Sequence, residues 1–267
     1  MKNQKLQNMP CRLGTTSYII PDEILPNLRF LADRVDDVEL VLFESDEYSN
    51  LPSQADVKEM AKIAQDNDLS YTVHLPLDAW PGTTDESIRK NSMEKGFRVM
   101  DLMEPLNPFA WIVHLNDAPS NDPPTNKHRT LLDWQNQCGK SLEDLTNRTK
   151  PSLLCIETLG YDYNWAWPMV EEKKCSVCLD IGHLVVNGYD VAAYCDAWLK
   201  YARVLHVHGV NNAGRDHVDL SFLDSELLRY LLLNLKNENS VQRVMTLEIF
   251  SQNDFEKSID VLEQFLQ

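Results

Sequence analysis

The sequence predicts a single α/β domain that folds as a closed (β/α)₈ barrel. Eight short apolar runs alternate strictly with longer stretches of helical periodicity, and no linker or shift in composition divides the chain. A doubly wound open sheet usually has fewer such units and a glycine-rich first turn, whereas the first turn here reads GTTSYIIP. We therefore expect a barrel over residues 12–267, preceded by a polar extension over residues 1–11.

The predicted strands are almost continuously apolar and rich in β-branched residues. This pattern is typical of parallel strands that are buried on both faces. The eight strands are predicted at Arg12–Ser17, Val38–Glu44, Tyr71–Leu75, Trp111–Leu115, Leu153–Glu157, Ser176–Asp180, Val204–His208 and Val244–Ile249.

The stretches between these strands carry apolar residues three or four positions apart, as one face of a helix requires. Residues that favour helix N-caps precede several of them, and we expect caps at Ser53, Thr84, Ser221 and Asn253. The clearest helical runs are Ile24–Leu31, Val57–Ala64, Phe97–Met103, Leu227–Leu235 and the segment from Asn253 to the end.

Charge and composition exclude several classes of protein. The formal net charge of −16 disfavours binding to a phosphate backbone, so we expect no nucleic-acid partner. The first residues form no apolar signal region, and no apolar run approaches the roughly 20 residues of a membrane span. We expect a cytoplasmic protein without a membrane partner, whose six cysteines are mostly buried free thiols, including the C-x-x-C pair Cys175 and Cys178.

Polar side chains gather where the predicted strands end. In a parallel barrel these ends form one face, and active sites lie there. Carboxylates fall at the ends of strands two, five, six and eight, at Glu44, Glu157, Asp180 and Glu248. Of the seven histidines, all but His128 fall at or just after strand ends, at His74, His114, His183, His206, His208 and His217.

Imidazole and carboxylate groups are the usual ligands of zinc, manganese and iron. A single strand-end histidine is more often a satisfied core residue, but several converging carboxylates need a compensating cation. We therefore predict a divalent-metal site at the C-terminal face of the barrel, with zinc preferred over manganese. The predicted ligands are Glu157, Asp180, His208 and Glu248, with His74, His114, His183 and His217 as further ligands.

His206 and His208 are two residues apart and face the same way along their strand. One of them can ligate a metal while the other forms an outer hydrogen bond or contacts substrate. We favour His208 as the ligand and leave His206 in the second role. Glu44 is either a base beside the metal ligands or one partner of a buried pair.

The ordered set of strand-end residues resembles the xylose isomerase-like superfamily of barrels, which includes sugar epimerases and endonuclease IV-like phosphodiesterases. The resemblance runs from Arg12 to the end of the chain. It implies one metal on Glu157, Asp180, His208 and Glu248, and further metals on the remaining histidines. Arg215 stands where that pattern has an acidic ligand in its D-x-H segment, unless Asp216 takes that place in a shifted register, so we expect one or two ions rather than three.

Three segments are similar to the cobamide-remodelling phosphodiesterases of this superfamily. They are GTTSYIIPDEILPNLRFLADRVDDVELVLFE, LSYTVHLPLD and CLDIGHL. The resemblance implies hydrolysis of a phosphoester in the nucleotide loop of adenosylated cobamides, with a small-molecule corrinoid as substrate. In that chemistry metal ions supply hydroxide and neutralise phosphoryl charge. Glu157 would bridge the metals, and Glu248 or Glu44 would orient water.

Two loops are candidates for substrate binding. The segment GYDYNWAWP would offer an aromatic wall to a flat corrinoid, or would pack onto the outer helices instead. Arg215 would clamp a phosphate oxygen or form a surface ion pair. The segment Asp117–His128 is a candidate lid or a surface loop. The aromatic candidates are Tyr161, Tyr163, Trp165 and Trp167.

Three other functions compete with this interpretation. A metal-dependent sugar or sugar-acid isomerase or epimerase would use Glu157 and Glu248 as an acid–base pair around one ion, and would not need the four additional histidines. A DNA-repair endonuclease is disfavoured by the acidic charge. A non-catalytic corrinoid-binding protein would retain its function after a Glu157→Gln substitution. The oligomeric state is not predicted.

Overall fold

The computed structural model describes residues 5–45, 48–117, 130–237 and 241–266. The predicted lid and His128 fall almost wholly outside these residues, as does the start of the predicted N-terminal extension. The described part of that extension lies against the barrel, because Leu6 and Met9 pack on the core and Lys5 Nζ donates to the Asn67 carbonyl at 2.9 Å.

The strands form one closed parallel barrel in the order β1 to β8, which confirms the predicted fold class. Each strand pairs in parallel with its two sequence neighbours, and β8 pairs with β1. The strands are β1 Arg12–Thr16, β2 Asp37–Val41, β3 Ser70–His74, β4 Ala110–Val113, β5 Leu154–Glu157, β6 Ser176–Asp180, β7 Ala202–Val207 and β8 Val244–Leu247.

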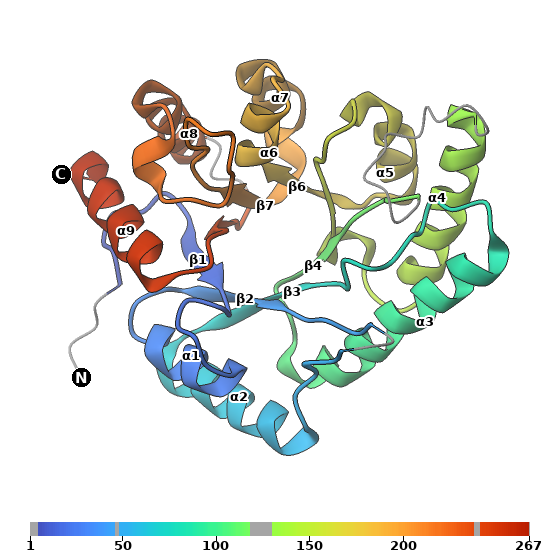
Figure 1. Ribbon diagram of the computed structural model, residues 1–267, viewed down its shortest axis with the longest axis horizontal. Coiled ribbons are helices and arrows are strands. Elements are labelled where there is room, and N and C mark those ends of the chain that lie inside the picture. Colours follow the sequence, from blue (N-terminus) through green and yellow to red (C-terminus); the bar gives the residue numbers. More distant parts are fainter. Residues whose placement is uncertain (1–4, 46–47, 118–129, 238–240, 267) are drawn as a thin grey trace.

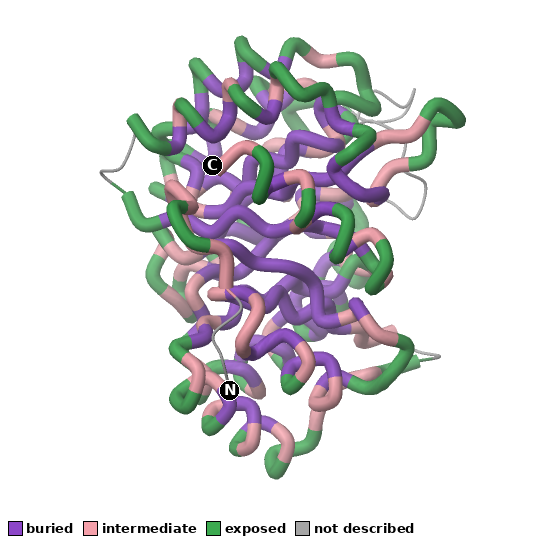
Figure 2. Tube along the Cα trace, turned by 90° about the vertical axis from the view of Figure 1, so that its left-hand side faces the viewer, coloured by how far each residue is buried: buried purple, intermediate pink, exposed green. Residues whose placement is uncertain are grey.

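The α-helices surround the strands as an outer ring (Figure 1). Figure 2 shows the strands as a buried band through the middle of the molecule, while the helices alternate between buried and exposed positions. Among the described residues, no helix is both long and apolar enough to cross a membrane. The α-helices are α1 Ile24–Leu31, α2 Gln54–Asn67, α3 Glu86–Met103, α4 Leu131–Thr146, α5 Trp167–Lys173, α6 Ile181–Val186, α7 Val191–Trp198, α8 Ser225–Asn237 and α9 Gln252–Leu266.

The predicted N-caps are right at one position and wrong at three. Ser53 forms a capping box with Asp56 at the start of α2, as expected. The helices α3, α8 and α9 are instead capped by the side chains of Asp85, Asp224 and Ser251, which accept the free N–H groups of their first turns. In each case the true N-cap lies within three positions of the predicted one and is also a residue type that favours caps. The sequence alone therefore does not determine which of the two begins the helix.

The barrel interior is tightly filled near the N-terminal ends of the strands. A Cβ atom on Gly14 of β1 would lie 2.9 Å from Val244 Cγ1 and 3.3 Å from Asp37 Cβ, so only glycine fits between β8 and β2. The cysteines are free thiols, and five of the six are buried as predicted. Burial raises the pKa of the Cys175 thiol to about 12, which keeps it protonated and unreactive.

Candidate metal centre

The predicted metal ligands come together at the C-terminal ends of the strands. His74, Glu157 and Asp180 are the last residues of β3, β5 and β6, and His208 and Glu248 directly follow β7 and β8. Because all eight strands are parallel, these ends share one face of the barrel. The topology therefore brings these five residues into one cluster, and all five are buried.

Glu157 lies at the middle of this cluster, and its two oxygens face different groups. Oε2 lies 2.9 Å from His114 Nε2 and 3.5 Å from His74 Nε2. Oε1 lies 3.2 Å from His183 Nδ1, on the side of Asp180. A carboxylate with this arrangement can be shared between two neighbouring ions.

The two histidines beside Oε2 form a compact pair. The ring centroids of His74 and His114 are 4.7 Å apart and nearly perpendicular. His74 Nδ1 lies 2.8 Å from the Leu75 carbonyl, which fixes the proton on that nitrogen and leaves Nε2 directed at Glu157. The ligand atoms of His74, His114 and Glu157 all lie within 4.8 Å of one another, as donors to a single ion must.

The second group lies on the other side of Glu157. Asp180 ends β6 and caps α6, where its Oδ1 accepts the His183 N–H at 2.7 Å. Because His183 lies in the first turn of α6, three residues after Asp180, its imidazole lies next to the Asp180 carboxylate. His183 Nδ1 is 3.0 Å from Asp180 Oδ2. The ligand atoms of Glu157, Asp180, His183 and Glu248 also lie within 4.8 Å of one another.

His208 and His217 complete this side of the cluster. His208 Nε2 lies 3.5 Å from Asp180 Oδ1 and 4.0 Å from Glu248 Oε2, and His217 Nδ1 lies 3.5 Å from the same Glu248 oxygen. The His208 ring lies directly over Gly182, where a Cβ atom would come within 2.0 Å of its Cε1. Glycine is therefore required between Asp180 and His183 for this ring to reach the cluster.

Buried polar atoms without partners indicate that the cluster suits a cation. Buried donors and acceptors are rarely left unpaired in folded proteins, because each costs free energy. Several such atoms face one another here, and together they match the oxygen and nitrogen ligands that zinc and manganese take. The buried atoms here that form no hydrogen bond, although several lie within ion-pair distance of one another, are Glu157 Oε1, Asp180 Oδ2, His183 Nδ1, His206 Nδ1, His208 Nε2 and Glu248 Oε2.

The electrostatics of the cluster agree with this interpretation. Burial favours a raised pKa for Glu157, but the nearby His114 and His206 hold it well below its usual range. Burial also opposes a charge on His183, yet Asp180 and Glu157 raise its pKa to about 10. The carboxylates thus keep their charge and need cations beside them, which protons on the histidines or divalent ions can supply.

Glu44 does not join the other two predicted catalytic carboxylates. The strand β2 ends at Val41, three residues earlier than predicted, so Glu44 lies in the following loop. Its Oε1 lies 3.1 Å from Arg98 Nε on α3, at a partly exposed position. Glu44 thus forms an ion pair as one of the two interpretations expected, but the pair is partly exposed and not buried, and it lies outside the cluster.

The predicted aromatic wall is mostly built into the core. Tyr161 packs edge-on against Trp134, and Tyr163 is fully buried against Trp198 with its hydroxyl donating to the Ile156 carbonyl at 3.0 Å. Trp165 is half-buried against the core, and Trp167 lies against Tyr201, which precedes β7. These rings pack around the barrel, so the packing alternative describes this segment better than a wall for substrate.

Two other predicted substrate contacts have different surroundings. Arg215 is exposed on the turn after β7, where its backbone pairs with Asn211. His206 is completely buried, and its Nε2 lies 2.9 Å from Glu39 Oε2 inside the barrel. His206 is thus placed beneath the cluster and away from the open face where a substrate would enter.

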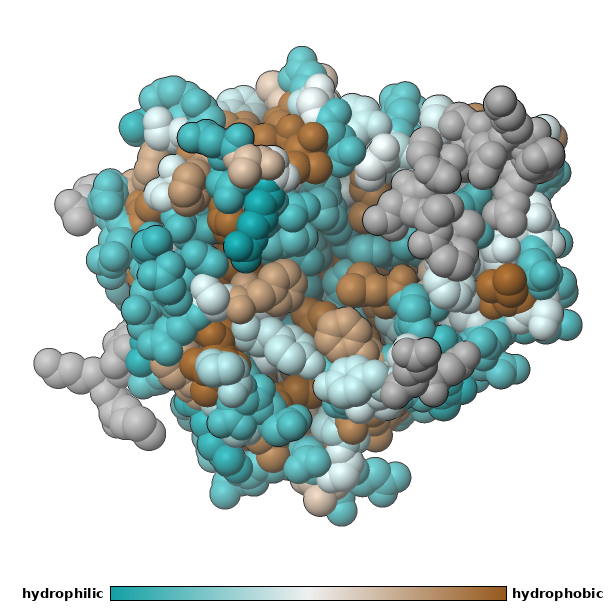
Figure 3. Space-filling view, viewed as in Figure 1, coloured by the Kyte–Doolittle hydropathy of each residue, from teal (hydrophilic) through white to brown (hydrophobic). Residues whose placement is uncertain are grey.

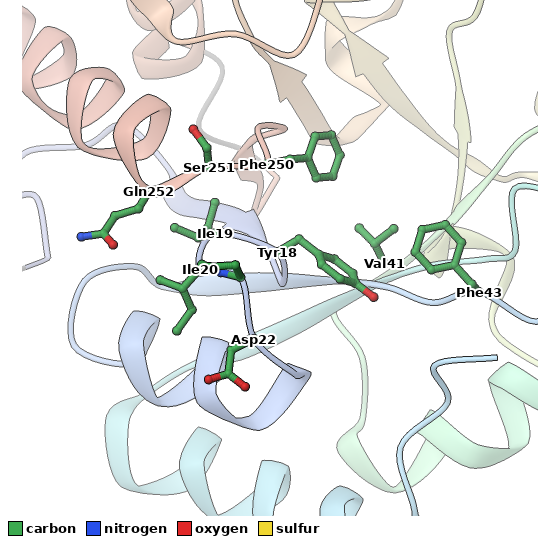
Figure 4. A pocket seen from close by; sticks show the side chains of 10 residues that line it. Tyr18, Ile19, Ile20, Asp22, Val41, Phe43, Phe250, Ser251 and Gln252 are labelled. Atoms are coloured by element: carbon green, nitrogen blue, oxygen red, sulfur yellow. The ribbon is translucent and has the colours of Figure 1, made fainter. Parts of the chain in front are cut away.

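We predicted from the sequence neither a role for Glu39 nor the apolar cavity that lies beside the cluster. Glu39 is a buried charge in the middle of β2, a position that was itself a signal because such strands are otherwise apolar. The cavity has a volume of about 660 Å³ and lies at the ends of β8, β1 and β2. Figure 4 shows Tyr18, Val41, Phe43 and Phe250 around it, and Phe250 lies 5.4 Å from the His217 ring.

The face drawn in Figure 3 has hydrophobic side chains next to hydrophilic ones around a hollow near its centre. A mixed lining of this kind suits a ligand with one polar and one apolar part. Phe250, which lines the cavity, also packs edge-on against His217 of the cluster, so the two features are neighbours on this face.

Comparison with solved structures finds the same fold over nearly the whole chain. A D-tagatose 3-epimerase-like protein superposes with a TM-score of 0.75 at 17% identity, covering 96% of this chain and 97% of that one. The 3-keto-D-glucoside 4-epimerase of E. coli gives 0.71 at 15%, covering 96% and 98%. Endonuclease IV from Thermus thermophilus gives 0.66 at 15%, covering 95% and 99%.

No curated protein sequence matches the chain significantly. The family model described as the xylose isomerase-like TIM barrel matches residues 32–265, from just after α1 almost to the end of α9. This match spans β2 to β8 and includes every residue of the cluster, and it agrees with the superpositions. The chain therefore belongs to the xylose isomerase-like TIM barrel family.

Proposed function

We propose that the protein is a metal-dependent phosphodiesterase that hydrolyses the nucleotide-loop phosphoester of adenosylated cobamides. One observation carries the proposal: Glu157 directs one oxygen at His74 and His114 and the other at His183, beside Asp180. Two groups of donors that share a carboxylate are suited to two neighbouring ions. Paired ions are a common solution for phosphoryl transfer.

The residues of both groups have defined tasks in such a reaction. Glu157, His74 and His114 would hold one ion, and Glu157, Asp180, His183 and Glu248 would hold the other, with His208 and His217 beside Glu248. When bound, zinc or manganese supplies hydroxide at neutral pH and neutralises charge on phosphoryl oxygens. Glu248 is the most accessible of the three carboxylates, at 6% exposure, and is suited to accept a proton from the attacking water.

The apolar cavity supports a substrate that is larger than a simple phosphodiester. A volume of about 660 Å³ lies in the range of sites for drug-sized ligands, so the cavity would take one part of a cobamide and not the whole molecule. Its aromatic lining next to a cation site fits a molecule with a phosphate near a bulky, partly apolar group, and cobamides have this character. The similarity of three sequence segments to cobamide-remodelling enzymes supports the same choice.

A sugar epimerase is the second candidate, and a specific observation favours it. Oxygens of Glu157 and Glu248 lie within 4.8 Å of each other on one group of donors, as an acid–base pair around a single ion would. Two of the superposed structures are described as epimerases or epimerase-like. The His74–His114 pair has no task in that chemistry, and we therefore place the phosphodiesterase first.

The two functions are separated by assaying the same protein on both substrate classes. The chain, loaded with Zn²⁺ or Mn²⁺, is incubated with adenosylcobalamin and separately with ketohexoses, and products are resolved by chromatography. We expect cleavage of the cobamide, no sugar conversion, and two ions per chain by elemental analysis. Intact cobamide under every metal condition rejects the phosphodiesterase, and sugar conversion with one bound ion establishes the epimerase.

A further inference from the structure

A buried pair of side chains lies directly beneath the metal centre, and its histidine, His206, is the alternative to His208 as a ligand. Glu39 on β2 and His206 on β7 are both fully buried, and Glu39 Oε2 lies 2.9 Å from His206 Nε2. The two residues are far apart in the chain and meet only because the barrel closes. A charged residue in this environment is costly unless it has a partner, so the contact fixes both side chains.

The other nitrogen of the His206 ring faces the metal-binding carboxylates. Its Nδ1 lies 3.3 Å from Glu248 Oε2, 3.6 Å from Asp180 Oδ2 and 3.7 Å from Glu157 Oε1. The 3.3 Å separation is the shortest approach of any histidine to Glu248 Oε2 among the described residues. His206 is therefore hydrogen-bonded to Glu39 on one side, and on the other its Nδ1 faces three carboxylates at ion-pair distance without a hydrogen bond.

We propose that Glu39 and His206 form a positioning pair that holds these carboxylates from below and so sets how tightly the centre binds metal. Glu39 orients the imidazole ring, and the ring orients the carboxylates, without contact between either residue and substrate. Outer partners of this kind typically change metal affinity by about 10- to 100-fold when they are removed. The inference rests on the proposed metal centre but is independent of the identity of the substrate.

The strand β2 provides a matched control for Glu39. Asp37 lies two residues earlier on the same strand and is also fully buried, but its oxygens accept from Ser70 Oγ at 2.5 Å and from the Thr72 N–H at 3.2 Å. These hydrogen bonds lead to β3 and not to the metal-binding cluster. An Asp37→Asn variant therefore changes a buried carboxyl on the same strand while leaving the Glu39–His206 hydrogen bond in place.

The test measures Zn²⁺ binding to the full chain by competition with a chromophoric chelator. We expect Glu39→Gln to weaken Zn²⁺ binding by about 10- to 100-fold, Asp37→Asn to leave it unchanged, and Glu39→Asp to restore part of the loss. The double variant Glu39→Gln with His206→Gln should bind no more weakly than His206→Gln alone, because the two residues act as one unit.

Two further measurements separate positioning from a general structural role. The metal-free Glu39→Gln chain should keep the far-UV circular dichroism spectrum of the wild type, and the visible spectrum of its bound Co²⁺ should show the same number of nitrogen ligands. Zn²⁺ affinity within about twofold of wild type in Glu39→Gln overturns the proposal, as does an equal loss in Asp37→Asn. Loss of a nitrogen ligand from the Co²⁺ spectrum of His206→Gln also overturns it, because His206 would then be a ligand.

Failure of this proposal can be distinguished from failure of the proposed function. A wild-type chain that binds Zn²⁺ but leaves adenosylcobalamin intact rejects the phosphodiesterase while the affinity test proceeds unchanged. If His206→Gln does not fold, the comparison of Glu39→Gln, Glu39→Asp and Asp37→Asn decides the question alone.

Discussion

The two ends of the barrel interior treat buried carboxylates in different ways. Near the N-terminal end, both oxygens of Asp37 accept hydrogen bonds from β3. At the C-terminal end, Glu157, Asp180 and Glu248 each keep a buried oxygen without a hydrogen-bond partner. If these carboxylates served only the stability of the fold, we would expect their buried oxygens to be hydrogen-bonded at both ends of the barrel. The difference supports our proposal that the C-terminal end of the barrel holds a cation.

The pKa values at the two ends shift in opposite directions although both groups are buried. Burial raises the pKa of Asp37 to about 6, since hydrogen bonds from Ser70 and Thr72 offset it only in part. Burial acts the same way on Glu248, but His206 holds the pKa of that carboxyl below its usual range. Burial alone therefore does not determine the pKa of a buried carboxyl in this barrel. At Glu248 the neighbouring imidazole of His206 outweighs the effect of burial.

The largest effect is expected at Glu157, which both donor groups share. A Glu157→Gln substitution keeps the shape of the side chain but removes the charge that would bridge two ions. We expect turnover to fall by at least about 10³-fold and metal content to drop below two ions per chain. Steady-state kinetics and elemental analysis measure this, with Glu263→Gln on the exposed face of α9 as the control. Full activity in Glu157→Gln would refute a shared carboxylate.

Metal removal should destabilise the chain by a smaller amount. The C-terminal end holds several buried charges that an ion would neutralise, and a ligand that binds only the folded state stabilises it. At a free metal concentration about 100 times the Kd, the expected gain is about 2.7 kcal/mol, or roughly 5–10 °C in Tm. Thermal unfolding with zinc and with excess chelator measures the difference. Identical transitions in both would show that the cluster binds no ion.

Asp37 predicts a pH dependence that arises at the opposite end of the barrel. Its pKa rises from 3.8 to about 6 on folding, so the folded state binds the proton more tightly than the unfolded state. This contribution favours folding below about pH 4 and is lost as the pH rises through about 6. The stability of the wild type relative to Asp37→Asn should therefore fall by up to about 3 kcal/mol between about pH 4 and pH 7. Denaturant titrations across this range measure it, and a constant difference would contradict the raised pKa.

The smallest effect is expected in the apolar cavity beside the metal centre. Phe250 is 45% exposed and lines the cavity, so Phe250→Ala should cost only about 1 kcal/mol of substrate binding. We expect KM for adenosylcobalamin to rise about fivefold, with little change for a small phosphodiester such as bis(p-nitrophenyl) phosphate. An equal rise in KM for both substrates would contradict this prediction, because it would show that Phe250 affects the metal centre and not only the binding of the larger substrate.

The fold and the strand-end cluster were predictable because they depend on local patterns and on one topological rule. Apolar runs identified all eight strands, and parallel strands must present their last residues on one face. Glu157 and Asp180 therefore lie where the sequence implies. The same rule is sufficient to bring residues from six strands together.

The remaining features depend on tertiary packing that local patterns do not encode. The strand β2 ends at Val41, and Glu44 in the following loop pairs with Arg98 on α3 and away from the cluster. The segment containing Tyr161 and Tyr163 has a composition that suits both a binding wall and a packed core, and only the neighbouring Trp134 and Trp198 decide between them. The histidine partner of Glu39 lies 167 positions away.

The most direct test of the account is anomalous diffraction at the zinc absorption edge from crystals of the zinc-loaded chain. We predict two peaks on either side of the Glu157 carboxylate, one beside His74 and His114 and the other beside Asp180 and Glu248. A structure without a peak in this cluster, or with a single peak and His114 still hydrogen-bonded to Glu157, would contradict a shared two-ion centre.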